Sequence, residues 1–163
     1  MASLTPAEPV AFKWDKPFYL QAAETGLFDG RHIEPIEGEI IEMSPIGNPH
    51  DAAVSLLQYR LSVIFPFSQY YVRVQMGFDT AGQSVPEPDI AVVRGTPFDY
   101  LEAKPQEAES IVEVSESSLV YDLGLKTGLY ARGGIPRVLD RKPGRPHAGG
   151  LSVAIGLRAL RIP

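Results

Sequence analysis

The sequence predicts a single α/β domain in which a mixed central sheet is flanked by helices. Two short, almost purely apolar runs, at 89–93 and 111–114, are typical of central strands that are covered on both faces. Apolar residues recur at helical spacing in 50–64, and a further helical segment is expected at 121–132. A length of 163 residues suits one core, and the absence of cysteine excludes disulfides, thiolate zinc sites and cysteine nucleophiles.

Local signals mark where most of these elements begin and end. Asp15 is a good N-cap, and Gly26 is a good stop for the first helix. The pair Glu37-Gly38 lies between two apolar runs and predicts a hairpin, whose first strand Pro35 confines to an edge. The expected order is a helix at 15–26, a hairpin at 33–43, a helix at 50–64, strands at 70–78, 89–93 and 111–114, and a helix at 121–132.

Charge and hydropathy limit the partners of the chain. No apolar stretch approaches the roughly 20 residues that span a bilayer, and the N-terminus does not resemble a signal peptide, so we expect a cytoplasmic protein without membrane contacts. The net charge is −5, yet residues 141–163 hold five Lys/Arg and no Asp/Glu. The acidic remainder does not attract nucleic acid by bulk charge. Phosphate binding therefore requires a local site, such as a metal ion or the basic tail.

Two carboxylates within the apolar runs are the strongest chemical signal. Asp89 opens one run and Glu113 lies inside the other. Buried carboxylates on neighbouring strands repel each other, and a divalent cation with a preference for oxygen ligands, Mg²⁺ or Mn²⁺, relieves that repulsion. Lys126 on the following helix can reach the strand ends, where it could hold a phosphate or help to activate a water. Two acids and a lysine around a metal suit phosphodiester hydrolysis.

Structural readings of the same residues remain open. Asp89 could be a turn or cap residue, and Glu113 could lie on an exposed edge strand. Lys126 could pair with Asp122, four residues earlier, on a solvated helix face. His50 is more readily explained as the start of its helix than as a metal ligand.

At these positions the sequence resembles the Uma-type family of restriction-endonuclease-like proteins. The resemblance covers about residues 15–136 and is carried by GEIIEMSP at 38–45, His50, VPEPDIAVV at 85–93, IVEVS at 111–115, Asp122, Lys126 and YARGGIP at 130–136. It implies the PD-(D/E)XK nuclease fold, with Asp89 and Glu113 as catalytic metal ligands and the Val114 carbonyl as a further ligand. Ser115 stands where such nucleases carry a lysine, and the resemblance implies that Lys126 replaces it.

The family's upstream acid matches Glu39, which the resemblance makes an auxiliary metal ligand. The alternative for Glu39 is an ordinary acidic hairpin, because Glu34, Glu37 and Glu42 are close by in the sequence.

The expected function is a metal-dependent endonuclease that hydrolyses DNA phosphodiester bonds with Mg²⁺ or Mn²⁺. The alternative is a non-catalytic nuclease-fold module that binds DNA or a protein partner. A homodimer is compatible with either function. We expect a flexible leader at 1–14, a nuclease-like domain at 15–140 and a poorly ordered basic tail at 141–163. The abrupt loss of aromatic residues after Tyr130 leads us to expect a truncated or frame-shifted C-terminal end.

Overall fold

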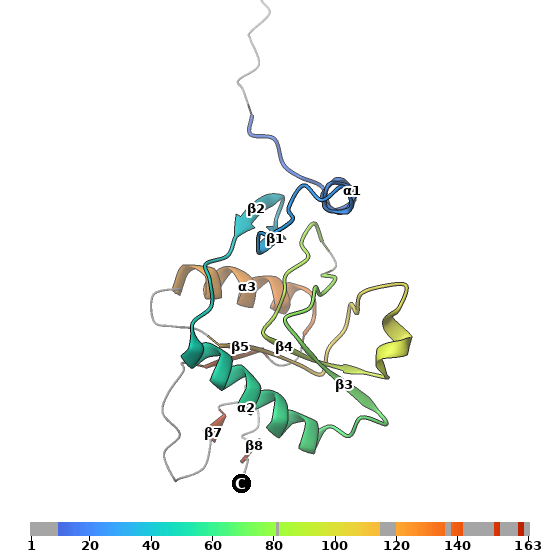
Figure 1. The fold of residues 1–163 in the computed structure, drawn as a ribbon, viewed down its shortest axis with the longest axis vertical. Coiled ribbons are helices and arrows are strands. Elements are labelled where there is room, and N and C mark those ends of the chain that lie inside the picture. Colours follow the sequence, from blue (N-terminus) through green and yellow to red (C-terminus); the bar gives the residue numbers. More distant parts are fainter. Residues whose placement is uncertain are drawn as a thin grey trace, which may run out of the picture.

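A four-stranded mixed sheet lies at the centre of the computed structural model, which describes residues 10–80, 82–114, 120–135, 138–141, 152–153 and 160–161 (Figure 1). The strands lie in the order β3 (Tyr70–Val74), β4 (Ile90–Arg94), β5 (Ser110–Val114) and β6 (Val138–Arg141). The first three are antiparallel neighbours, whereas β5 and β6 are parallel. The predicted mixed central sheet is therefore confirmed.

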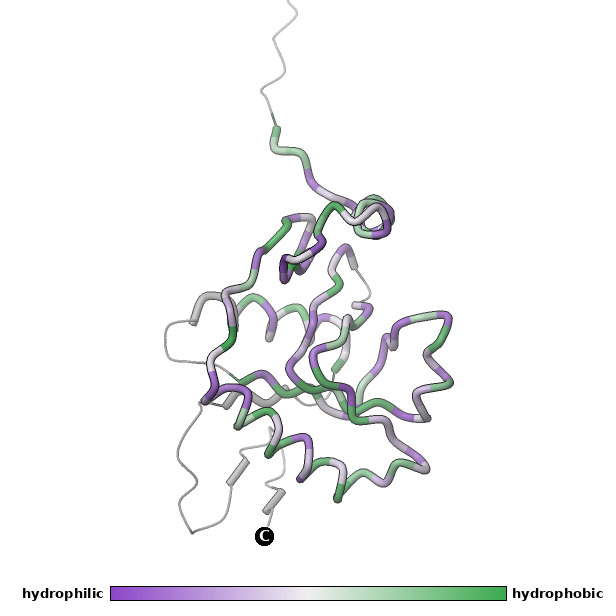
Figure 2. Tube along the Cα trace, in the orientation of Figure 1, coloured by the Kyte–Doolittle hydropathy of each residue, from purple (hydrophilic) through white to green (hydrophobic). Residues whose placement is uncertain are grey.

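Helices cover both faces of this sheet, as Figure 1 shows for α2 (Asn48–Ile64) and α3 (Val120–Arg132) on opposite sides. On one face Val54, Leu57 and Leu61 of α2 pack against alternate residues of β4 and β5. On the other face Tyr130 of α3 packs against the intervening strand residues. Figure 2 shows the resulting hydrophobic stretches along the central strands. Continuous apolar runs are needed here because both sides of each strand face a core.

Strand β3 is shorter than the alternating pattern of 70–78 predicted. It ends at Val74 because Gln75 adopts a left-handed backbone, with φ of 48°. The Gln75 N–H still donates to the carbonyl of Asp89 at 3.2 Å, but the chain then leaves the sheet. Phe78 turns inward to join the core beneath α3. The apolar pattern thus extends past the end of the strand because Phe78, although it lies in the loop after β3, is still buried in the core.

The predicted hairpin is present as β1 (Ile33–Ile36) and β2 (Glu39–Glu42). Its two turn residues both have positive φ, 51° at Glu37 and 81° at Gly38, which matches the twist of a two-residue hairpin. Although Pro35 removes a backbone donor, its carbonyl accepts a hydrogen bond from Val85 N at 3.0 Å. The loop before β4 therefore covers β1, and all four β1 residues are buried.

The described residues at the two ends of the chain form a capped helix and a short strand pair. Helix α1 (Lys16–Glu24) is capped by Asp15, whose Oδ1 accepts from Phe18 N at 2.7 Å. Of the leader expected at 1–14, Trp14 donates its N–H to the Gly38 carbonyl at 3.0 Å, and residues 1–9 lie outside the described part. Most of the expected tail also lies outside it. Within the tail, β7 (Ser152–Val153) and β8 (Leu160–Arg161) form a separate antiparallel pair.

A helix that crosses a bilayer must be both long and apolar. Among the described residues, no helix combines the length and the apolar character needed to cross a bilayer.

The hairpin turn yields a stability prediction. We expect Gly38→Ala to lower the free energy of unfolding by about 1–2 kcal/mol, because a side chain disfavours the left-handed backbone. The added Cβ would also lie 3.1 Å from Lys13 Cβ and 3.2 Å from the Trp14 carbonyl oxygen. Urea denaturation measures the change. Gly82→Ala is the matched control, because its Cβ would meet nothing within 4 Å. Equal stability of the two variants would contradict the turn assignment.

Candidate active site

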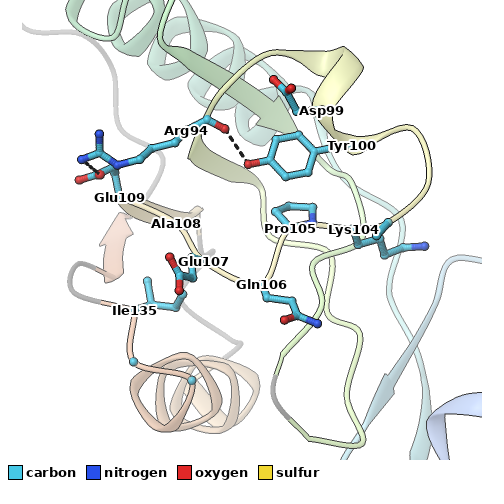
Figure 3. Close-up of a pocket in the computed structure, with 13 residues that line it drawn as sticks. Arg94, Asp99, Tyr100, Lys104, Pro105, Gln106, Glu107, Ala108, Glu109 and Ile135 are labelled. Atoms are coloured by element: carbon cyan, nitrogen blue, oxygen red, sulfur yellow. Dashed lines mark hydrogen bonds and ion pairs between the residues drawn. The ribbon is translucent and has the colours of Figure 1, made fainter.

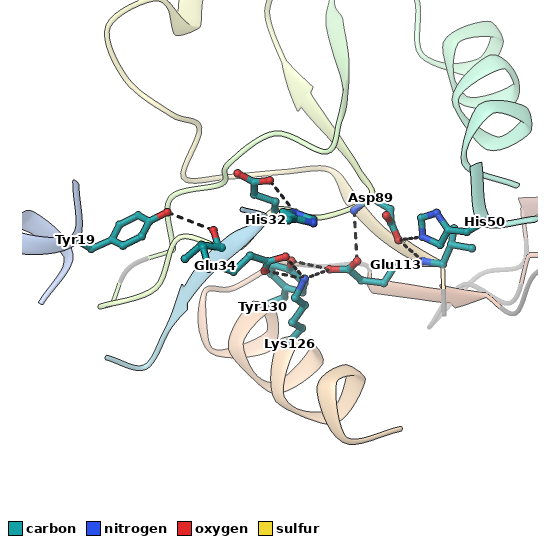
Figure 4. Close-up of polar contacts among 11 residues, drawn as sticks. Tyr19, His32, Glu34, His50, Asp89, Glu113, Lys126 and Tyr130 are labelled. Carbon is teal, nitrogen blue, oxygen red and sulfur yellow. Dashed lines mark hydrogen bonds and ion pairs between the residues drawn. The ribbon is translucent and has the colours of Figure 1, made fainter. Parts of the chain in front are cut away.

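The two predicted acids lie side by side at one end of the sheet (Figure 4). Asp89 directly precedes β4, and Glu113 lies in β5, where the antiparallel pairing sets Ile90 opposite Val112. Both side chains are buried. The backbone N–H of Asp89 points to Glu113 Oε2 at a long distance of 3.4 Å. The structure therefore brings the two carboxylates together, and Glu113 is on a central strand rather than on an exposed edge.

The Asp89 carboxylate is held from two sides. Its Oδ2 accepts a hydrogen bond from the backbone N–H of Val114 at 2.7 Å and lies 3.1 Å from His50 Nε2. These two contacts come from β5 and from the first turn of α2. Within the described ranges no hydrogen bond reaches Asp89 Oδ1, so this second oxygen is left for another partner.

Glu113 is in a less favourable setting for a negative charge. Burial raises its pKa from 4.5 to about 7, and the neighbouring charge of Asp89 acts in the same direction. Lys126 and the hydroxyl of Tyr130 oppose this shift. Tyr130 donates to Glu113 Oε1 at 2.8 Å and is itself completely buried, so burial and then Glu113 raise the pKa of its hydroxyl. Tyr130 therefore stays a donor to the carboxylate.

Lys126 lies inside this cluster and not on a solvated helix face. It is 8% exposed, and its Nζ lies 2.8 Å from both carboxylate oxygens of Glu34 and 4.0 Å from Glu113 Oε1. Burial alone would lower the pKa of Lys126, but Glu113 and Glu34 outweigh it and raise that pKa. The ammonium group is therefore protonated. The side chain of Asp122, its alternative partner, lies outside the described residues.

Glu34 occupies the place that the sequence assigned to Glu39. Glu39 is exposed and pairs with Lys13 at 2.6 Å, so the structure does not bring it to the other acids. Glu34 is 1% exposed because its strand is covered by the loop before β4. Glu34 lies between the apolar residues Ile33 and Pro35, whereas Glu39 directly follows the turn. This difference is the sequence signal that favours Glu34 as the buried acid.

The donor set fits a divalent cation in part. Three buried carboxyl groups, those of Glu34, Asp89 and Glu113, face one buried ammonium group, so positive charge is in deficit. In the part of the chain that the structure describes, no three His, Asp or Glu side chains are arranged to hold a metal by themselves. Mg²⁺ commonly binds through only one or two carboxylates and completes its shell with water and substrate phosphate. Asp89 and Glu113 suit that role.

A separate polar pocket lies at the opposite end of β4 (Figure 3). Arg94, which ends β4, pairs there with Glu109 and accepts a hydrogen bond on its carbonyl from Tyr100 at 2.6 Å. The residues that line it include Lys104 and Ile135 but none of the buried acids. The pocket and the acid cluster are therefore distinct features of the fold.

Comparison with known proteins supports a nuclease-like assignment. A family model described as "Uma2: Putative restriction endonuclease" matches residues 18–145. Among solved structures, one similar chain is described as "a putative nuclease belonging to DUF820 from Anabaena variabilis ATCC 29413". It is 16% identical, with a TM-score of 0.58, and the alignment covers 69% of this chain and 67% of that one. This likeness shows a shared fold. No curated protein matches the sequence.

The raised pKa of Glu113 predicts how stability depends on pH without metal. Between pH 4.5 and about 7 the folded protein keeps a proton that the unfolded chain has released, so this group's stabilising contribution falls as pH rises. Glu113→Gln removes the effect. In EDTA, we expect the unfolding free energy of the variant minus that of wild type to increase as pH rises across this window, by up to about 3 kcal/mol. A pH-independent difference in urea denaturation would contradict the assignment.

Proposed function

Because this chain belongs to the Uma2 family, as its motifs indicated, we propose that it is a metal-dependent endonuclease that hydrolyses DNA phosphodiester bonds. The observation that carries the proposal is the pair of buried carboxylates, Asp89 and Glu113, with one lysine beside them. A structural ion pair would match its groups one to one, whereas this cluster sets an excess of buried carboxyl groups, three in all, against one ammonium group. An excess of this kind is expected where a cation binds in the working state.

Mg²⁺ or Mn²⁺ is the proposed cofactor. Asp89 and Glu113 would hold it through their carboxylates, with the Val114 carbonyl as a further oxygen ligand. When bound, such an ion polarises the scissile phosphoryl group and lowers the pKa of a coordinated water. The geometry of Asp89 supports this role, because both described hydrogen bonds fall on Oδ2 and leave Oδ1 for the ion.

Lys126 is proposed to stabilise negative charge and not to act as a base. Its raised pKa keeps the ammonium group protonated, so it has no lone pair with which to take a proton from water. A protonated lysine beside the metal ligands can instead donate to a phosphate oxygen as charge develops there. Glu34 holds the lysine within reach of Glu113, and Tyr130, one turn later on α3, donates to the same Glu113 oxygen.

One observation favours the alternative, a nuclease-fold module that binds DNA or a protein without cleaving it. Lys126 already contacts both oxygens of Glu34, as a purely structural buried pair would. In that case the buried acids would be part of the fold without taking part in catalysis. Cleavage and metal binding by the variants below separate the two functions.

The metal ligands can be tested with Asp89→Asn. Loss of one anionic ligand should weaken Mn²⁺ binding at least about tenfold and reduce cleavage of plasmid DNA in parallel. Calorimetry and a nicking assay give the two readouts. Asp51→Asn, an exposed aspartate in the first turn of α2, is the matched control and should change neither. Unchanged Mn²⁺ affinity in Asp89→Asn would refute the metal site.

The lysine requires a pair of variants, because Lys126→Met leaves Glu34 buried without its partner. That single change should cost about 3–5 kcal/mol of stability. Adding Glu34→Gln removes the stranded charge and should restore most of the loss in urea denaturation. Both proteins should cleave DNA about 10²-fold or more slowly than wild type, because the charge stabilisation is gone. Recovery of cleavage together with stability in the double variant would leave Lys126 a purely structural role.

A further inference from the structure

His50 is a buried polar residue that the mechanism above does not use. It lies in the first turn of α2, is 9% exposed, and places Nε2 3.1 Å from Asp89 Oδ2 (Figure 4). Its other ring nitrogen, Nδ1, is buried and has no hydrogen-bond partner among the described residues. A buried ring nitrogen without a partner costs free energy, so the position of the ring calls for a compensating contact.

The contact with Asp89 identifies which nitrogen carries the proton. An ionised carboxylate can only accept hydrogen bonds, so Nε2 must be the donor. In the neutral imidazole this leaves Nδ1 as the unpartnered acceptor. The tautomer of His50 is therefore set by Asp89. The ring is oriented so that Nε2 donates to the carboxylate, and this orientation leaves Nδ1 without a described partner.

The helix gives this contact a rigid base. His50, Val54, Leu57 and Leu61 are the buried residues of α2 and recur at the spacing of one helix face. The three apolar members pack against the sheet, so the same face carries His50 to the start of β4. Core packing thus fixes the helix that carries the imidazole, and this helix covers the face of the sheet opposite α3 (Figure 1).

We propose that His50 is a positioning residue that holds Asp89 Oδ2 so that Oδ1 faces the metal ion. This inference rests on the proposed metal-dependent function. Two donors converge on one carboxylate oxygen, His50 Nε2 at 3.1 Å and Val114 N at 2.7 Å, and together they fix the rotation of the carboxyl plane. Because Nε2, the nitrogen that faces the carboxylate, carries its proton and has no lone pair to offer, we assign His50 to act through Asp89. Groups that orient metal ligands in this manner govern metal affinity.

The test compares two amides at position 50. In His50→Gln the side-chain amide nitrogen reaches the place of imidazole Nε2, whereas in His50→Asn it stops at the place of Nδ1. We expect His50→Asn to weaken Mn²⁺ binding by about 10–100-fold, measured by electron paramagnetic resonance, and His50→Gln to retain most of the affinity. His32→Asn is the control, because His32 pairs with Glu87 at 3.2 Å and has no described contact with Asp89 or Glu113.

The outcomes separate this inference from the proposed function. Wild-type Mn²⁺ affinity in His50→Asn, or equal loss in folded His50→Gln and His50→Asn, would overturn the positioning role. Absence of Mn²⁺ binding by wild type would instead refute the proposed function. Nitrogen-15 spectra of the neutral imidazole in metal-free wild type test the contact in either case. They should show the proton on Nε2, and a proton on Nδ1 would overturn the inference.

Discussion

Buried negative charge without enough positive charge to balance it is the constraint around which this fold is organised. Glu34, Asp89 and Glu113 are all withdrawn from water, and Lys126 is the one buried ammonium group described beside them. Each carboxylate that loses its hydration must gain other partners, or it will bind a proton. The raised pKa of Glu113 shows that the described partners compensate its charge incompletely. The divalent cation that we propose would supply the missing positive charge in place of a proton.

The two helices and the hairpin around the sheet each supply side chains that take part in this cluster. Helix α2 presents His50 to Asp89, and helix α3 presents Lys126 and Tyr130 to Glu113. The hairpin adds Glu34, which keeps Lys126 charged and in place. These side chains come from segments far apart in the chain, so the cluster forms only when the two cores on either face of the sheet are packed. Stability of the fold and geometry of the site are therefore linked.

The sequence predicted the parts of this arrangement that have a local signal. Asp89 and Glu113 interrupt apolar runs, and a carboxylate in such a run is unusual enough to be identified from the order of residues alone. The apolar neighbours of Glu34 gave only a weak signal, and the choice between Glu34 and Glu39 was decided by the loop that ends at Asp89 and covers β1, far along the chain. Likewise β3 ends where Gln75 adopts a left-handed backbone conformation, and the alternation of side chains does not predict that conformation. The role proposed for His50 depends on its contact with Asp89, 39 positions later in the sequence.

In the function proposed above, Asp89 and Glu113 share one divalent cation. Anomalous diffraction from crystals of the protein soaked in MnCl₂ tests it most directly, because the signal locates manganese without reference to activity. We expect one peak between the two side chains, about 2.1 Å from Asp89 Oδ1 and from a Glu113 oxygen. No peak at this position, with Asp89 and Glu113 still in their metal-free hydrogen bonds, would contradict it.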